Sequence, residues 1–133
     1  EPAHSVGETL LRLAALRDQF AARYRRLVDT LLQLGLPLTL CTIYEGNIPE
    51  PDLHRAAATA LAVFNEAILR CAFSAGLPVI DLRMLCNTPA DYANPIEPSA
   101  TGGDKIARVI ATVVATHDFA TGRSAVYGTR KDI

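Results

Sequence analysis

Hydrophobic residues recur at helical spacing in three stretches of the chain, residues 10–31, 58–72 and 106–114. Each stretch predicts an amphipathic helix that packs one apolar face on a core. Helix starts are predicted at polar residues that cap free backbone N–H groups, namely Ser5 with Glu8, Asp52, and Thr101 with Asp104. Gly35 and Gly76 are expected to end the first two helices.

Two apolar runs are too short and too continuous to be helices of this kind. Leu38–Tyr44 and Val79–Leu82 each follow the tripeptide Gly-Leu-Pro and are predicted to be strands. Their continuous apolar character predicts burial on both faces, as in a parallel sheet covered by helices. Ser124–Tyr127 is expected to form either a short edge strand or a tail packed on the sheet, and residues 128–133 a mobile tail.

The repeated order of helix, Gly-Leu-Pro and strand predicts a single α/β domain over residues 1–133. We expect a flavodoxin-like three-layer sandwich with a parallel sheet, of which this chain supplies the C-terminal part. Two central strands are too few for such a sheet. The other strands are therefore expected from an N-terminal half that precedes residue 1, or from a partner chain.

Composition and charge narrow the range of partners. Half of the 133 residues are apolar and 20% are charged, as in a soluble globular domain. The net charge of −1 gives no reason to expect nucleic acid or an anionic membrane as a partner. No uninterrupted apolar run reaches the roughly 18 residues of a membrane span, and Cys41, Cys71 and Cys86 lack metal-ligand spacing. We expect buried, reduced thiols, a cytoplasmic location, and neither a metal nor another cofactor.

Polar residues gather after the two predicted strands, where open parallel sheets bind their ligands. We expect the two loops to face one crevice, whose candidate residues are Tyr44, Glu45, Asn47, Arg83, Asn87, Asp91, Asn94, Glu97 and Ser99. Glu45 with Glu97 or Asp91 could form the carboxylate pair of a glycosidase, but solvated or helix-capping carboxylates are the simpler interpretation. The run from Ser99 to Lys105 could bind an anion at a helix start, but Asp104 would repel phosphate there, so helix initiation explains it better.

The segment 91–107, DYANPIEPSATGGDKIA, resembles the last sequence block of the SGNH (GDSL-type) hydrolases. In that block an Asp and a His three residues apart precede Pro and a Gly-led helix. The strand Gly-Leu-Pro-Val-Ile-Asp-Leu is also family-like, and the resemblance covers most of residues 5–115. It implies a hydrolase that acts on small-molecule esters or acyl groups. The family's nucleophilic Ser, and the Gly and Asn of its oxyanion hole, have no counterpart in this chain, and its Asp and His positions fall on Asn94 and Glu97.

The replacement of the family's histidine by Glu97 leaves three interpretations open. A glutamate is a weaker base than a histidine for accepting and returning a serine proton. Glu97 is therefore either the proton acceptor of a variant hydrolase, part of a crevice that binds ligands without catalysis, or a structural residue that accepts hydrogen bonds from its own loop. His54 or His117 could also replace the lost histidine. By itself, the chain without a nucleophile block is expected to be inactive.

Overall fold

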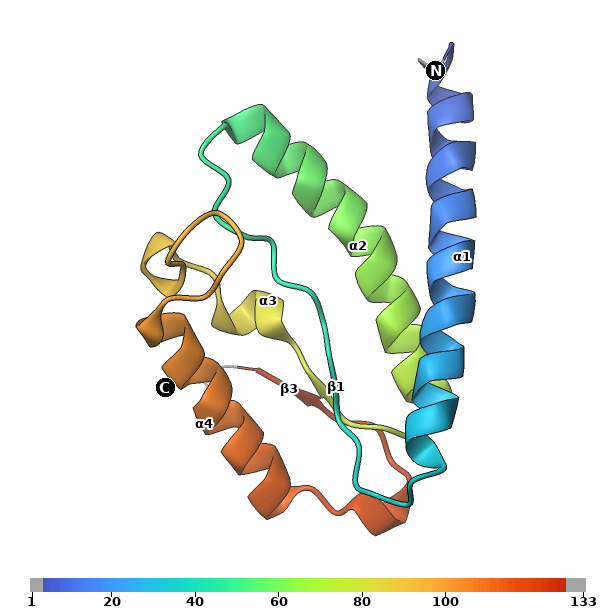
Figure 1. Ribbon diagram of the computed structural model, residues 1–133, viewed down its shortest axis with the longest axis vertical. Helices are drawn as coiled ribbons and strands as arrows, with labels where there is room; N and C mark the ends of the chain where they lie inside the picture. The colour runs from blue at the N-terminus through green and yellow to red at the C-terminus, as the bar shows by residue number, and fades with distance from the viewer. Residues whose placement is uncertain (1–3, 129–133) are drawn as a thin grey trace.

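A computed structural model describes residues 4–128 of the chain, and its first element is the long helix α1 (Val6–Leu32). The helix begins as predicted at Ser5, whose Oγ accepts a hydrogen bond from the N–H of Glu8 at 3.0 Å. Val28 is the one fully buried residue of α1. The first turns extend beyond the other elements (Figure 1), which leaves Leu10 and Leu11 more than half exposed.

The other two predicted helices are confirmed, although both begin earlier than expected. The second is α2 (Pro51–Ser74), and Glu50 rather than Asp52 accepts the N–H of Leu53, at 2.6 Å. The third is α4 (Ala100–Thr116), which begins after Ser99. Three short helical turns complete the helical elements, α3 (Leu82–Leu85), η1 (Pro89–Asp91) and η2 (Phe119–Thr121).

Three short parallel strands lie side by side in the order β1-β2-β3. They are β1 (Leu40–Cys41), β2 (Val79–Ile80) and β3 (Val126–Tyr127). The last of these is the edge strand that was one of the two expectations for residues 124–127. The expected mobile tail lies, apart from residue 128, outside the described residues.

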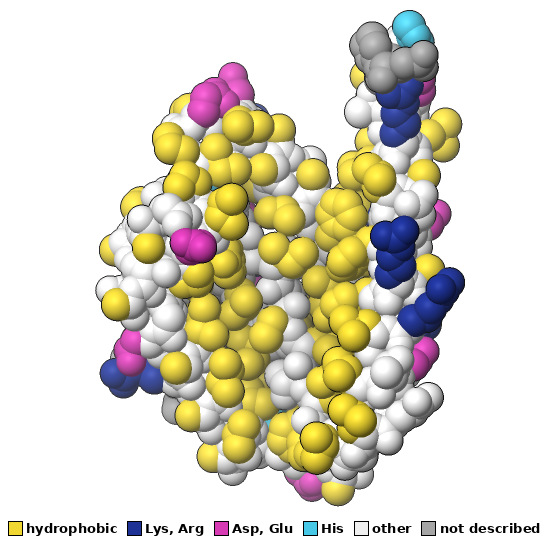
Figure 2. All heavy atoms as spheres, in the orientation of Figure 1, with side chains coloured by type: hydrophobic (Ala, Val, Ile, Leu, Met, Phe, Trp, Pro, Cys, Tyr) yellow, Lys and Arg dark blue, Asp and Glu magenta, His cyan; other side chains and the backbone are white. Residues whose placement is uncertain are grey.

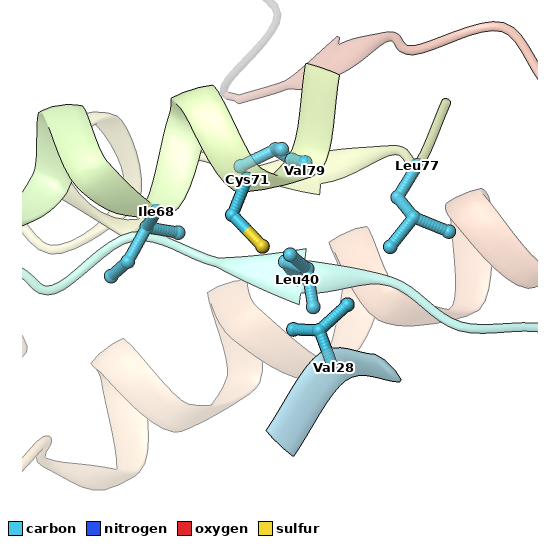
Figure 3. Packing of buried hydrophobic residues seen from close by; sticks show 7 residues of the cluster. Val28, Leu40, Ile68, Cys71, Leu77 and Val79 are labelled. Atoms are coloured by element: carbon cyan, nitrogen blue, oxygen red, sulfur yellow. The ribbon is translucent and has the colours of Figure 1, made fainter. Parts of the chain in front are cut away.

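Helices cover both faces of this small sheet. On one face, α1 and α2 pack against β1 and β2 through the cluster shown in Figure 3, which contains Val28, Leu40, Ile68, Cys71, Ala72, Leu77 and Val79. On the other face, α3 and α4 pack through Ile80, Leu85, Cys86 and Val113. All three cysteines are free, and burial raises the pKa of each thiol.

The expectation of a flavodoxin-like α/β sandwich is wrong. Within the described residues 4–128, the chain is 62% helix and 6% strand, with only the three-stranded parallel sheet. The apolar runs are long enough for full strands, but each pairs over only two residues. Beyond Thr42 the ladder does not continue, because the N–H of Leu82 bonds to the Thr42 hydroxyl and the carboxylate of Asp81 caps α3. Side chains thus end both strands early.

By length and composition, α2 could cross a membrane, which the search for uninterrupted apolar runs did not predict. The same helix contributes five buried residues to the fold, namely Asn65, Ala67, Ile68, Cys71 and Ala72. Core helices of soluble proteins share this length and composition. Helix α2 therefore does not indicate whether this segment lies in a membrane or in the core of the fold.

Candidate functional site

A buried polar network joins the carboxyl ends of β1 and β2. The Thr42 hydroxyl donates to Asp81 Oδ1 at 2.9 Å, and Arg83 donates to both carboxylate oxygens of Asp81, at 2.8 and 2.6 Å. The bonds from Arg83 hold the pKa of Asp81 below its usual value. The sequence analysis missed this network because Asp81 was assigned to the interior of a strand. Its position just after a buried apolar run was the available signal.

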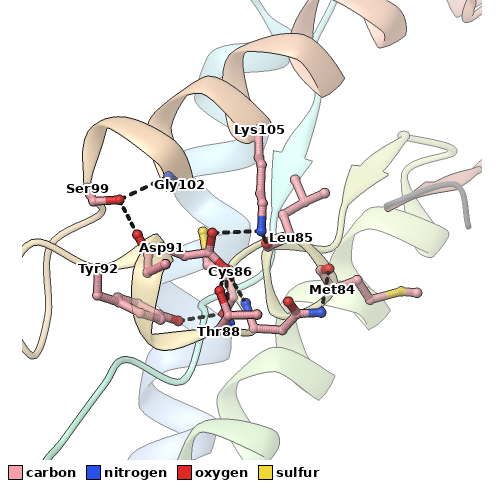
Figure 4. A network of polar contacts seen from close by, with 11 residues as sticks. Met84, Leu85, Cys86, Thr88, Asp91, Tyr92, Ser99, Gly102 and Lys105 are labelled. Carbon is pink, nitrogen blue, oxygen red and sulfur yellow. Dashed lines mark hydrogen bonds and ion pairs between the residues drawn. The ribbon is translucent and has the colours of Figure 1, made fainter.

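Asp91 is a structural anchor of the next loop rather than an open pocket residue. Its side chain is fully buried, and Oδ1 lies 2.7 Å from Lys105 Nζ of α4. The other oxygen, Oδ2, accepts the N–H of Asn87 and both the N–H and hydroxyl of Thr88, at 2.9 to 3.1 Å (Figure 4). Burial opposes ionisation of Asp91, but the bonds from Lys105 and Thr88 outweigh it and lower the pKa.

Ser99 closes the same loop at the start of α4. Its Oγ accepts the N–H of Gly102 at 3.2 Å and donates to the carbonyl of Ala90 at 2.6 Å (Figure 4). Its N–H donates to the Asp91 carbonyl at 2.8 Å. A Cβ on Gly102 would lie 2.2 Å from that carbonyl oxygen, whereas a Cβ on Gly103 would meet nothing. Ser99 is therefore a capping residue, and Gly102 permits the close approach of α4 to Asp91.

Asn87 and Tyr92 fasten the loop to the end of α3. Asn87 Nδ2 donates to the Met84 carbonyl at 3.1 Å, and the Tyr92 hydroxyl donates to the Cys86 carbonyl at 2.6 Å. Asn87 is exposed, but its backbone and its side chain are both used within the loop. It belongs with Asp91 and Ser99 to what we call the loop base: Asn87, Thr88, Asp91, Ser99, Gly102 and Lys105.

Residues 93–98 form the exposed loop tip, which carries Asn94 and Glu97. Asn94 Nδ2 donates to Glu97 Oε2 at 2.5 Å. Asn94 Oδ1 accepts the N–H groups of Ile96 and Glu97, both at 2.9 Å. The loop N–H groups that were considered as partners of Glu97 thus bond to Asn94, which in turn orients the glutamate carboxylate.

The loop after β1 lies against the loop tip, as expected from the carboxyl ends of neighbouring strands. The N–H of Asn47 donates to the Pro95 carbonyl at 2.9 Å. Gly46 has a positive φ of 80°, and a Cβ there would lie 2.6 Å from the same Pro95 oxygen. Only glycine allows the two loops to approach this closely without strain.

Tyr44, which follows β1, lies beside Tyr92, the residue that precedes the loop tip. Its ring packs edge-on against Tyr92, with centroids 5.7 Å apart. Burial raises the pKa of Tyr44, and the nearby Cys86 and Glu97 raise it further.

Glu45 and the histidines have contacts of their own. Glu45 Oε2 lies 3.8 Å from His54 Nε2 in the first turn of α2. His117 ends α4, and its Nδ1 lies 2.9 Å from the Tyr127 hydroxyl. Asp91 is fully buried and paired to Lys105, so it does not serve as the open carboxylate of a glycosidase-like pair.

A groove lined by α1 and α2 lies away from these loops. It has a volume of about 560 Å³, and its charged lining residues are Arg17, Asp18, Arg25, Glu66 and Arg70. Arg17 pairs with Asp18, and Arg70 pairs with Glu66. The groove therefore presents mostly neutralised charges, and it contains none of the predicted site residues.

The loop tip thus presents an exposed carboxylate oriented by an amide, on a loop held by the ion pair of the buried Asp91 with Lys105. Such an arrangement can accept a proton or bind a donor group. Within residues 4–128 there is no group of three His, Cys, Asp or Glu side chains placed to hold a metal ion. Searches of protein-family models, curated proteins and solved structures found no match to this chain.

Proposed function

We propose that this chain supplies the proton-accepting part of an ester or acyl hydrolase of SGNH-like type. The observation that carries the proposal is the hydrogen bond from Asn94 Nδ2 to Glu97 Oε2, which orients a carboxylate at an exposed loop tip. These are the two positions at which the family resemblance places its Asp and His. An orienting residue and a proton acceptor therefore remain paired, with their chemical types changed.

In this proposal a serine hydroxyl from polypeptide outside residues 1–133 attacks the carbonyl carbon of an ester. Glu97 accepts the hydroxyl proton as the new acyl bond forms and returns it to the departing alcohol oxygen. Water then attacks the acyl group in the same way, which releases the acid and regenerates the serine.

Hydrolysis of p-nitrophenyl acetate by the polypeptide expressed from the complete reading frame that encodes residues 1–133 tests the proposal. General base catalysis contributes about 100-fold or more, so Glu97→Gln should lower kcat by at least about 100-fold. Glu66→Gln is the matched control, because this exposed glutamate pairs with Arg70 on α2. Equal rates for the wild type and Glu97→Gln would remove Glu97 from catalysis.

A second candidate is a module that binds ligands without turnover. It is favoured by the hydrogen bonds of Ser99, the serine nearest to Glu97 in the sequence. The Ser99 hydroxyl accepts the N–H of Gly102 and donates to the carbonyl of Ala90, so it caps α4 and does not act as a nucleophile beside Glu97. This candidate predicts saturable binding of an ester or amide in titration calorimetry, with no product formed over hours. Steady release of nitrophenol that requires Glu97 would exclude it.

A further inference from the structure

Helix α1 is longer than the surface on which it packs. Its 27 residues span about 40 Å, yet only Val28 is fully buried, whereas α2 buries five of its 24 residues. Val6 and Leu10 in the first turns are 79% and 58% exposed, and Leu27 near the other end is 54% exposed. Figure 2 shows the upper part of α1 standing clear of the body, beside a hollow that hydrophobic side chains line. The apolar side of α1 is therefore covered over only part of its length.

The apolar residues of α1 follow a heptad repeat along the whole helix. Its positions are spaced alternately by four and three residues, and all but Arg17 are apolar: Val6, Leu10, Leu13, Arg17, Phe20, Tyr24, Leu27 and Leu31. Such a seam over four heptads is typical of helices that pair with other helices in a coiled coil. Phe20 and Tyr24 pack against the buried cluster of Figure 3, so this chain covers the middle of the seam itself.

A second groove, beside the exposed part of the seam, has room for the side chains of another helix. It has a volume of about 370 Å³, and its lining includes Leu16, Phe20, Arg23, Tyr24, Leu27 and Phe64. Phe20 joins the two helices that border the groove, since its ring packs edge-on against Phe64 of α2 with centroids 5.2 Å apart. Arg23 makes no ion pair among the described residues, so this mainly apolar groove has an uncompensated positive charge.

The chain exposes more surface than a folded monomer of its size. Folded monomers of 14.3 kDa expose about 6,800 Å², whereas this chain exposes 8891 Å². Even after an allowance of about 1,200 Å² for full exposure of the eight residues outside the description, a surplus of roughly 1,000 Å² remains. A standard protein interface buries about 800 Å² on each partner. The surplus is thus large enough for one side of a stable dimer interface.

The seam matches itself when two copies of α1 run antiparallel. A two-fold axis near Leu16 brings Val6 of one copy opposite Leu27 of the other, and Leu13 opposite Phe20. The exposed first turns of each copy then cover the groove and the exposed Leu27 of the other. One symmetric contact thus covers both unpacked ends of the seam.

The charges beside the seam fit the antiparallel direction. About the same axis, Glu8 of one copy faces Arg23 of the other, which gives that arginine a carboxylate partner. In a parallel dimer, by contrast, Arg12 and Arg23 would each lie beside the same residue of the second copy, and like charges repel. A different partner would not require apolar and charged positions that are symmetric about one residue. The symmetry therefore favours a second copy of this chain.

We infer that this protein forms a homodimer through antiparallel α1 helices, with the two-fold axis near Leu16. The first half of α1 from one copy, residues 6–13, occupies the groove of the other. This dimer leaves the sheet three-stranded. It is independent of the proposed function, because the contact uses α1 and its groove rather than the loop tip.

Sedimentation equilibrium of the product of the complete reading frame tests the dimer. The wild type should sediment at twice its sequence mass at micromolar concentration. A monomer would overturn the inference, in favour of cover by another segment of the same polypeptide.

A pair of glutamate variants identifies the face of α1 that makes the contact. Leu16→Glu places two carboxylates across the axis and should raise the dissociation constant of the dimer at least about 100-fold. Leu11→Glu is the matched control, because Leu11 is also exposed but lies on the side of α1 opposite to the seam. Both variants should keep the helical signal in circular dichroism. A dimeric Leu16→Glu, or equal dissociation of the two variants, would refute the contact.

Disulfide cross-linking reports the direction of the two helices. In the antiparallel dimer Leu16 lies beside its counterpart, whereas the two copies of Leu27 are about 30 Å apart along the helices. With oxidised glutathione, Leu16→Cys should therefore form a cross-linked dimer, and Leu27→Cys should not exceed the wild type with its three native cysteines. Cross-linking of both variants would show parallel helices, and cross-linking of neither would exclude the axis near Leu16. Either result would overturn the inference.

Discussion

The loop base and the loop tip belong to the same short segment, yet they are built in opposite ways. At the base, Asp91 is fully buried and bonded on both oxygens. At the tip, Asn94 and Glu97 are exposed and bonded mainly to each other. Polar residues that looked like one site in the sequence therefore divide into a group that positions the loop and a group that is left for chemistry.

Removing the buried charge at the base should have the largest effect on stability. Asp91→Asn leaves Lys105 without its partner, and breaking a buried pair costs about 3 kcal/mol of the free energy of unfolding. Urea denaturation at pH 7 measures this cost. Asp104→Asn, which affects an exposed pair with Arg108 on α4, should leave the free energy of unfolding unchanged.

The same pair predicts a pH dependence. Because the pKa of Asp91 is lowered in the folded protein, its stabilising contribution is complete above its unfolded pKa of about 3.9 and is lost as the pH falls through the folded value. The stability difference between the wild type and Asp91→Asn should therefore be constant near neutral pH and shrink below about pH 4. A difference that grows on acidification would contradict this assignment.

Gly102 and Gly103, in the first turn of α4, allow a comparison with a smaller expected effect on stability. Gly102→Ala forces a Cβ to within 2.2 Å of the Asp91 carbonyl oxygen and should cost about 2–3 kcal/mol. Gly103→Ala meets no atom and should gain up to about 1 kcal/mol from helix propensity. Equal effects of the two substitutions in thermal unfolding would show that α4 does not press on the loop base as described.

The smallest expected change lies at the tip and concerns activity. Asn94→Ala releases the Glu97 carboxylate and should lower kcat for p-nitrophenyl acetate roughly 10-fold, through loss of orientation. The stability should fall by at most about 1 kcal/mol. Asn87→Ala is the matched control, because its amide bonds only to Met84 at the base. A fall in kcat for Asn87→Ala as large as that for Asn94→Ala would mean that base and tip are not separable.

Local signals predicted the three long helices, because each has an apolar stripe and a polar start that are readable within a few residues. The strands were predicted at the right places and too long, since their ends depend on Thr42 and Asp81, which are 39 residues apart and bond to each other. The expected flavodoxin-like sandwich was wrong for a related reason. A continuous apolar run indicates that a segment is buried, but not how many strands lie beside it, and here helices bury the segments on a very small sheet.

For the candidate site, the rule that ligands lie beyond the carboxyl ends of strands predicted the meeting of the loops, seen in the bond between Asn47 and Pro95. The sequence did not predict which of these polar residues are buried in the loop base and which are exposed at the loop tip. This division depends on Lys105, which lies a helix turn inside α4 and reaches back to Asp91. The bond between Thr42 and Asp81 likewise joins residues that are distant in sequence.

The hydrogen bond between Ser99 and Asp91 joins the two ends of the loop tip independently of the side chains in the tip. Both ends of the tip are held by bonds that do not involve the tip itself, including Ser99 N–H to the Asp91 carbonyl. Replacements at the exposed positions Asn94, Ile96 and Glu97 therefore leave this bond in place, whereas Pro95 also carries the bond from Asn47. The side chains offered at the tip can thus change while the frame that holds the tip stays the same.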